Sequence, residues 1–222
     1  MKKTHSAPAV CRLSQKRRLV RERPAFMALG LALALVSGPL ATGNHALHAH
    51  SAVQGGFAVT THRNDNGHTG QYPDETILNT SNVNVSQFGK RVSYPVDGQL
   101  YAQPLYVPQL TIGGKVHNVV FAATENDSVY ALAVGQTKTV PPLWKRHLLP
   151  PGATPVPYTA VNCGDLQPVI GITSTPVIDT LTKTMFVVTY DLENGNLVYR
   201  LHALNITTGA DKSPPIVIRD RC

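Results

Sequence analysis

A similar segment occurs twice in this chain of 222 residues, and the two copies lie 72 positions apart: Pro104 corresponds to Pro176, and Leu132 to Leu204. Each copy holds three short apolar runs separated by turn-forming residues, the pattern of short strands and hairpins. The runs are 102–107, 119–123 and 128–132 in the first copy and 174–179, 185–189 and 199–204 in the second. The repeat predicts a fold assembled from small antiparallel sheets, one for each copy.

A repeated unit of three or four strands is typical of a β-propeller, in which each unit forms one blade. The 17 Gly and 17 Pro residues also favour strands and loops over helices. We therefore expect an all-β fold, a partial β-propeller of four-stranded antiparallel blades, with units at about 98–149 and 168–219. Closed propellers have about four to eight blades, so two units predict a truncated form of such a protein.

Turn signals and one further strand complete the expected blades. Asn-rich and Asp-rich turns are expected at 125–127 in the first copy and 191–196 in the second. Residues 90–96 read as a strand that precedes the first copy, and Asp97-Gly98 as the turn after it. In this interpretation the 90–96 strand would lack its usual partner, and the outward face of the second unit would expose Val and Ile side chains.

The positive charge of the chain is confined to its start. Residues 1–24 hold eight Lys and Arg residues and one acidic residue, whereas the remainder holds 12 basic and 12 acidic residues. Because the body of the chain is neutral, its formal net charge of +7 gives no support for nucleic-acid binding. We expect no nucleic-acid partner.

The basic start is followed by an apolar run of twelve residues, Ala25–Val36. This length suits the core of a signal peptide and is short for a membrane span of about 20 residues. We expect a signal peptide at 1–43, a polar linker and N-terminal segment at 44–87, and the propeller blades at 88–222. Cleavage between Gly43 and Ser51 would give a periplasmic or extracellular protein of a bacterial cell envelope with no membrane span. An uncleaved signal would leave it membrane-anchored.

The end of the second copy carries the most specific motif, Ala203-Leu204-Asn205-Ile206-Thr207-Thr208-Gly209. It resembles the tryptophan-docking motif of pyrroloquinoline-quinone-type, or quinoprotein-like, β-propellers. Ala203, Asn205, Thr208 and Gly209 match that pattern, with Asn in place of Asp, and Ser213 stands where the family has Trp. In the first copy Trp144 arrives late, after two prolines. The resemblance covers about residues 60–218 and implies that Trp144 is a blade-docking residue.

What this resemblance implies about activity is limited by missing residues. In the family's dehydrogenases the quinone stacks on a Trp under a ring formed by adjacent cysteines. A calcium ion held by Glu, Asn and Asp polarises it, and an Asp acts as base. This chain has no adjacent cysteines and a single Trp. We assign no catalytic residue, quinone ligand or metal ligand, and expect no cofactor. Pyrroloquinoline quinone with calcium is the alternative.

Three functions follow from this interpretation. The first is a non-catalytic binding or scaffold module, with a protein partner or self-association through open blade edges. The alternative is part of a quinone-dependent dehydrogenase-like enzyme, active only as a complete propeller. The third is a structural protein of the cell envelope with no small ligand.

Other residues with chemical potential have simpler interpretations. Glu125, Asn126 and Asp127 suit calcium, but a hairpin turn explains them better. The histidines of the linker, His45, His48 and His50, are read as a solvated spacer rather than a metal site. His202 is read as a packed or surface side chain rather than a base. Cys163 is read as a loop residue, and its pairing with Cys222 is left open.

Overall fold

The structure is a computed structural model that describes residues 57–73 and 75–219. The expected signal peptide, its cleavage site, the linker histidines and Cys222 lie outside these residues. The described part contains ten strands and one short helix. They are β1 (Leu105–Ile112), β2 (Lys115–Ala123), β3 (Ser128–Ala133), β4 (Trp144–His147), β5 (Thr154–Pro157), α1 (Tyr158–Val161), β6 (Val169–Ile170), β7 (Val177–Asp179), β8 (Thr184–Glu193), β9 (Asn196–Asn205) and β10 (Ile216–Ile218). The predicted all-β class is confirmed.

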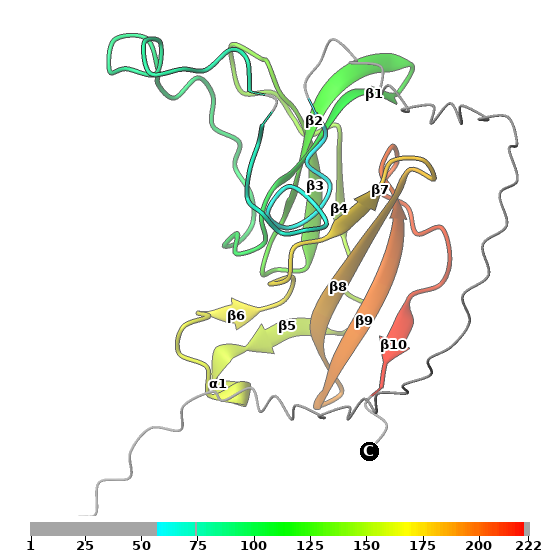
Figure 1. Ribbon diagram of the computed structural model, residues 1–222. Coiled ribbons are helices and arrows are strands. Elements are labelled where there is room, and N and C mark those ends of the chain that lie inside the picture. Colours follow the sequence, from blue (N-terminus) through cyan, green and yellow to red (C-terminus); the bar gives the residue numbers. More distant parts are fainter. Residues whose placement is uncertain (1–56, 74, 220–222) are drawn as a thin grey trace, which may run out of the picture. The chain divides into compact units, whose positions relative to one another are not determined.

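The first repeat forms a four-stranded antiparallel sheet in the order β1-β2-β3-β4, drawn in green in Figure 1. Each strand pairs with the next strand in the chain, as in a meander. β1 and β2 meet at Gly113-Gly114, where both residues have positive φ. The predicted turn at 125–127 joins β2 to β3, with Asp127 in the left-handed region. We refer to this unit as the first sheet.

The second repeat forms a larger antiparallel sheet, here called the second sheet, in the order β10-β9-β8-β5-β6, with β7 also paired to β8. β8 and β9 form its long hairpin. Its turn residues Asn194 and Gly195 have φ of 48° and 82°, as a two-residue type I′ turn requires. We expected four strands here. Two further strands join the second sheet: β5 of the proline-rich link, where Thr154 and Pro155 pair with the end of β8, and β6, which pairs with β5.

The strand expected at 90–96 is not formed, and that prediction was wrong. Pro95 has no N–H to donate to a ladder, and the segment is instead attached by side chains. The Tyr94 hydroxyl donates a hydrogen bond of 2.6 Å to the Ala133 carbonyl. Tyr94 and Val96 pack against Ala122, Tyr130 and Leu132. The segment therefore covers the face of the first sheet that carries these residues.

The opposite face of the first sheet packs against the second sheet. Phe121, Val129 and Ala131 from the first sheet share one buried cluster with Met185 and Leu204 from the second. Alternate residues of a strand point to opposite faces, so the odd-numbered residues of β2 and β3 face the second sheet. The two repeats thus form one core through face-to-face packing of sheets.

No helix in the described residues is long and apolar enough to cross a membrane.

Candidate functional site

The predicted docking residue Trp144 lies at the junction of the two repeats. It begins β4, at the edge of the first sheet, and its indole Nε1 donates a hydrogen bond of 3.0 Å to the Ile206 carbonyl of the second repeat. The indole also packs against Phe121 with ring centroids 5.7 Å apart. An indole is well suited to such a junction, because it buries a large apolar ring while its N–H finds an acceptor.

The turn that receives the indole is built by Asn205, Thr208 and Gly209. The Asn205 side-chain oxygen accepts hydrogen bonds of 2.8 Å from both the amide and the hydroxyl of Thr207. The Asn205 carbonyl accepts from the amides of Thr208 and Gly209. These side-chain contacts need only an acceptor oxygen, which Asn supplies as well as Asp.

Gly209 is required at this turn for two reasons. Its φ of 72° is strained for a residue with a side chain, and a Cβ atom would lie 2.7 Å from Cε3 of Trp144. The remaining motif residue, Ala203, accepts a hydrogen bond from the Lys212 amide as the chain leaves the turn. The structure therefore brings Trp144 and the predicted motif residues together across the two repeats.

An acidic residue makes a second contact between the repeats. Asp211 accepts a hydrogen bond from Arg146 of β4 at 3.3 Å and lies 3.0 Å from Nδ1 of His202 in β9. His202 is buried, and its Nε2 has no hydrogen-bond partner among the described residues. Of the packed or surface positions expected for His202, the structure shows the packed one.

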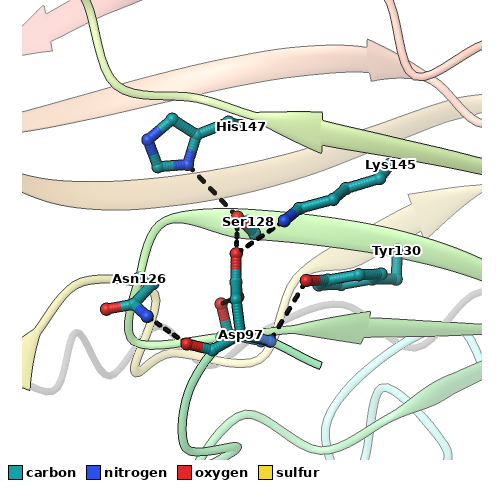
Figure 2. Close-up of polar contacts among 7 residues, drawn as sticks. Asp97, Asn126, Ser128, Tyr130, Lys145 and His147 are labelled. Carbon is teal, nitrogen blue, oxygen red and sulfur yellow. Dashed lines mark hydrogen bonds and ion pairs between the residues drawn. The ribbon is translucent and has the colours of Figure 1, made fainter. Parts of the chain in front are cut away.

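A polar cluster centred on Asp97 lies at the other end of β3 and β4 (Figure 2). The Asp97 carboxylate accepts from the Ser128 hydroxyl at 2.6 Å and from the Thr124 hydroxyl at 2.8 Å. The Lys145 ammonium lies 2.9 Å from the same carboxylate. The main chain of Asp97 is also held, since its amide donates to the Tyr130 hydroxyl and its carbonyl accepts from the Asn126 side chain.

The charge of Asp97 is favoured by these partners. Burial alone would raise the pKa of this carboxyl, but the hydrogen bonds from Ser128, Lys145 and Thr124 outweigh burial and lower the pKa below its usual value. The contact in turn raises the pKa of Lys145. The ion pair is therefore present at neutral pH.

Ser128 and His147 also lie together, with 3.2 Å between Oγ and Nδ1. In a serine-nucleophile site the hydroxyl donates to the histidine, which is oriented by the acid. Here the fully buried Ser128 hydroxyl donates to Asp97 instead. The cluster lacks the order of contacts that activates a nucleophile, and it anchors the 94–99 segment to β3 and β4.

Three carboxylates are fully buried where the two sheets meet: Glu125 and Asp127 from the turn of the first sheet and Asp191 from β8. Glu125 is partly satisfied, because Oε2 accepts from the Gly171 amide at 2.8 Å and from the Thr173 hydroxyl at 2.9 Å. Both oxygens of Asp127 and both of Asp191 have no hydrogen-bond partner among the described residues. Burial of polar atoms without partners is costly.

The environment of these acids favours their neutral forms. Burial, the nearby Asp191 and the nearby Glu125 raise the pKa of Asp127 to about 9. Burial likewise raises the pKa of Asp191 and that of Glu125. The nearest cation, Arg200, lies 3.3 Å from Asp191, but its hydrogen bonds go to Glu193 at 2.6–2.7 Å. Asp127 is therefore protonated at neutral pH.

The side chains considered for quinone or calcium contacts are engaged in other contacts in the described structure. The partly buried Trp144 ring lies against Gly209 and Phe121 at the edge of the core. The Asn126 side-chain amide donates a hydrogen bond to the Asp97 carbonyl. Within the described residues, no three His, Cys, Asp or Glu side chains are grouped so that they could hold a metal.

Cys163 follows α1, is partly buried and forms no disulfide with another described residue. Its neighbours in the chain carry the turn that leads to β6, as expected of a loop residue. A shallow cavity of about 470 Å³ lies elsewhere, between Lys90, Arg91 and Tyr94 on one side and residues 134–136 on the other. Neither Cys163 nor this cavity brings together described side chains in an arrangement suited to catalysis.

Sequence reasoning missed Asp97, Asp191 and Asp211 as partners in these clusters. Asp97-Gly98 and Asp191 each lie in a turn-rich stretch, where an acidic residue is normally solvated. One sequence feature could have pointed to these clusters. The segment Thr124-Glu125-Asn126-Asp127-Ser128, between two apolar runs, is rich in hydroxyl and acidic side chains.

Comparison of the chain with protein-family models, with curated proteins and with solved structures finds no match. The class of protein is therefore defined by the fold alone: an all-β protein of two packed antiparallel sheets, each containing one copy of the repeat.

Proposed function

We propose that this chain is an exported, quinoprotein-like propeller module that acts by non-catalytic binding or as a scaffold. The observation that carries the proposal is the Trp144 junction, in which a tryptophan of one repeat enters the Thr-Gly turn of the next. This junction stabilises the fold, because the Trp144 indole and Gly209 pack against each other. The polar clusters are likewise occupied by structural contacts.

The alternative function is part of a quinone-dependent dehydrogenase that needs further blades. The proposal and the alternative differ in quinone binding, so titration calorimetry with pyrroloquinoline quinone and calcium ions separates them. We expect no heat of binding and no shift in the quinone absorption spectrum. A dissociation constant near micromolar, about −8 kcal/mol, would contradict the non-catalytic function and favour the alternative.

Export to the periplasm or the cell exterior belongs to the same proposal and rests on the basic start and the Ala25–Val36 run. N-terminal sequencing of the chain recovered from outside the cytoplasm tests it. A start between residues 44 and 51 is expected, and an intact Met1 on membrane-bound material would contradict cleavage.

A further inference from the structure

Both faces of the second sheet carry large apolar side chains. Its inner face packs on the first sheet through Met185, Val187 and Leu204. Its outer face, the side turned away from the first sheet, carries large apolar side chains that are between 42% and 62% exposed: Val177, Phe186, Leu197, Tyr199, Ile216 and Ile218. We call these residues the outer apolar face.

The registers of the strands show that this face is continuous. Val177 pairs with Phe186 across β7 and β8, and Ile216 and Ile218 of β10 lie opposite Leu201 and Tyr199 of β9. Tyr199 in turn stacks on Tyr190 of β8, with ring centroids 4.0 Å apart and planes 6° from parallel. A contiguous apolar face of this kind is typical of an interaction site.

The charged side chains and the histidine of β8 and β9 lie on the other side of the sheet. β8 and β9 carry Asp191, Glu193, Arg200 and His202, which alternate in phase with the buried Met185 and Leu204 and therefore lie at inner positions. β10 contains only Ile, Val and Ile. On the outer side, Asp179 at the end of β7 is the one charged residue of the sheet's strands. An identical face brought against this one would therefore meet mainly apolar side chains, and little like-charge repulsion opposes the contact.

The repeat shows that this face has the same position as one already used for sheet packing. A shift of 72 residues relates Val129 and Ala131, which are buried against the second sheet, to Leu201 and Ala203 on the outer apolar side. The same shift relates Tyr130 and Leu132 to the inner-facing His202 and Leu204. The outer apolar face is thus the counterpart of a face that packs against another sheet.

Two observations indicate which partner covers the outer apolar face. The first repeat is fastened to the second by Trp144, and no tryptophan occurs in the second repeat to fasten a third unit in the same way. A head-to-tail contact with another copy would use the far face of the first sheet, which Tyr94 and Val96 already cover. The outer apolar face of the second sheet, by contrast, remains exposed to solvent.

We propose that the outer apolar face binds the same face of a second copy of this chain, forming a two-fold symmetric dimer. The contact is isologous, so each residue near the symmetry axis meets its own copy. This dimer names the partner of the proposed scaffold module, which is a second copy of the chain. The inference therefore rests on the proposed function. Dimerisation and quinone binding are measured separately, so failure of one is distinguishable from failure of the other.

Sedimentation velocity of the full chain at tens of micromolar tests the proposal. We expect a dimer for the native chain and a monomer for the double variant Tyr199→Glu/Ile216→Glu. The matched control is Leu181→Glu, in the β7–β8 turn, where Leu181 is 94% exposed outside this face. It should remain dimeric. Circular dichroism confirms that each variant keeps its sheets.

Cross-linking gives a second measurement that leaves the apolar face nearly intact. With the three native cysteines replaced by Ser, Ile218→Cys should form a covalent dimer with a short bifunctional maleimide, whereas Val116→Cys in the β1–β2 hairpin should not. A native chain that sediments as a monomer, a double variant that stays dimeric, or equal cross-linking at both positions would overturn the proposal.

Discussion

At the residue scale, the polar side chains of this protein act mainly by holding backbone segments in place. Asp97 is the clearest case, because five different residues contact its side chain or its main chain around one turn. Hydrogen bonds to a charged group contribute more than neutral ones, and removal of the acceptor leaves several donors unpaired.

Replacement of Asp97 should therefore cost much more than replacement of its cationic partner. We expect Asp97→Ala to lower the free energy of unfolding by about 2–3 kcal/mol, because the buried Ser128 and Thr124 hydroxyls lose their acceptor. Lys145→Met should cost less than about 1 kcal/mol, since exposed ion pairs contribute little. Urea unfolding of both variants measures this, and equal losses would contradict the anchoring function of Asp97.

The buried acid Asp127 makes a prediction about pH. Its folded pKa of about 9 lies above the ordinary value of 3.8. The folded state therefore keeps a proton that the unfolded state releases. The stability linked to Asp127 is fully present below about pH 4 and is lost as the pH rises toward about pH 9.

We expect Asp127→Asn to weaken this loss, because Asn cannot ionise. Between about pH 5 and about pH 9 the native chain should lose on the order of 5 kcal/mol more stability than the variant, since each pH unit between the two pKa values contributes about 1.4 kcal/mol. Urea unfolding at the two pH values measures the difference. Asp191→Asn should act in the same direction, because burial raises its pKa too. Parallel pH profiles for Asp127→Asn and the native chain would show that Asp127 does not titrate as described.

At the scale of elements, the apolar runs that form strands as predicted are those that pair with another strand on each side. The runs at 119–123, 128–132, 185–189 and 199–204 all lie within β2, β3, β8 and β9. The hairpin of β8 and β9 continues through polar residues to Glu193 and Asn196, because the type I′ turn keeps both strands paired. Local apolarity gives no sign of that extension.

The prediction fails where pairing depends on distant residues. Residues 90–96 alternate like a strand but attach through side chains, and the proline-rich link gains β5 only because the end of β8 offers a free edge. The buried carboxylates were missed for the same reason. Their burial comes from packing of Gly171 and β8 against the 125–127 turn, which no local pattern encodes.

The junction of the two sheets gives a prediction at this scale. Gly209→Ala places a Cβ atom against the Trp144 ring in addition to its strain at positive φ. Gly135→Ala is the matched control, since its φ of 83° is similar and no atom lies within 4 Å of the added Cβ.

We expect Gly209→Ala to destabilise the protein by about 1–3 kcal/mol more than Gly135→Ala, because overpacking adds to the backbone strain. Thermal unfolding of both variants measures the difference. Equal effects would show that the indole is not confined by the turn.

At the scale of the whole molecule, the two repeats form one body because their sheets share a core and are joined by polar contacts. These include the hydrogen bonds of Trp144 with Ile206, of Arg146 with Asp211, and of Glu125 with Gly171 and Thr173. Single domains of this size usually unfold as one unit. The packing therefore predicts that neither sheet survives loss of the other.

The chain contains a natural probe of this claim, because Trp144 is its only tryptophan and lies between the sheets. The most direct measurement is urea unfolding followed both by Trp144 fluorescence, which reports the junction, and by far-ultraviolet circular dichroism, which reports both sheets. We predict that the two transitions coincide in midpoint and slope. A fluorescence transition complete before the strands are lost would show that the repeats separate while still folded, and would contradict the account of a single coupled module.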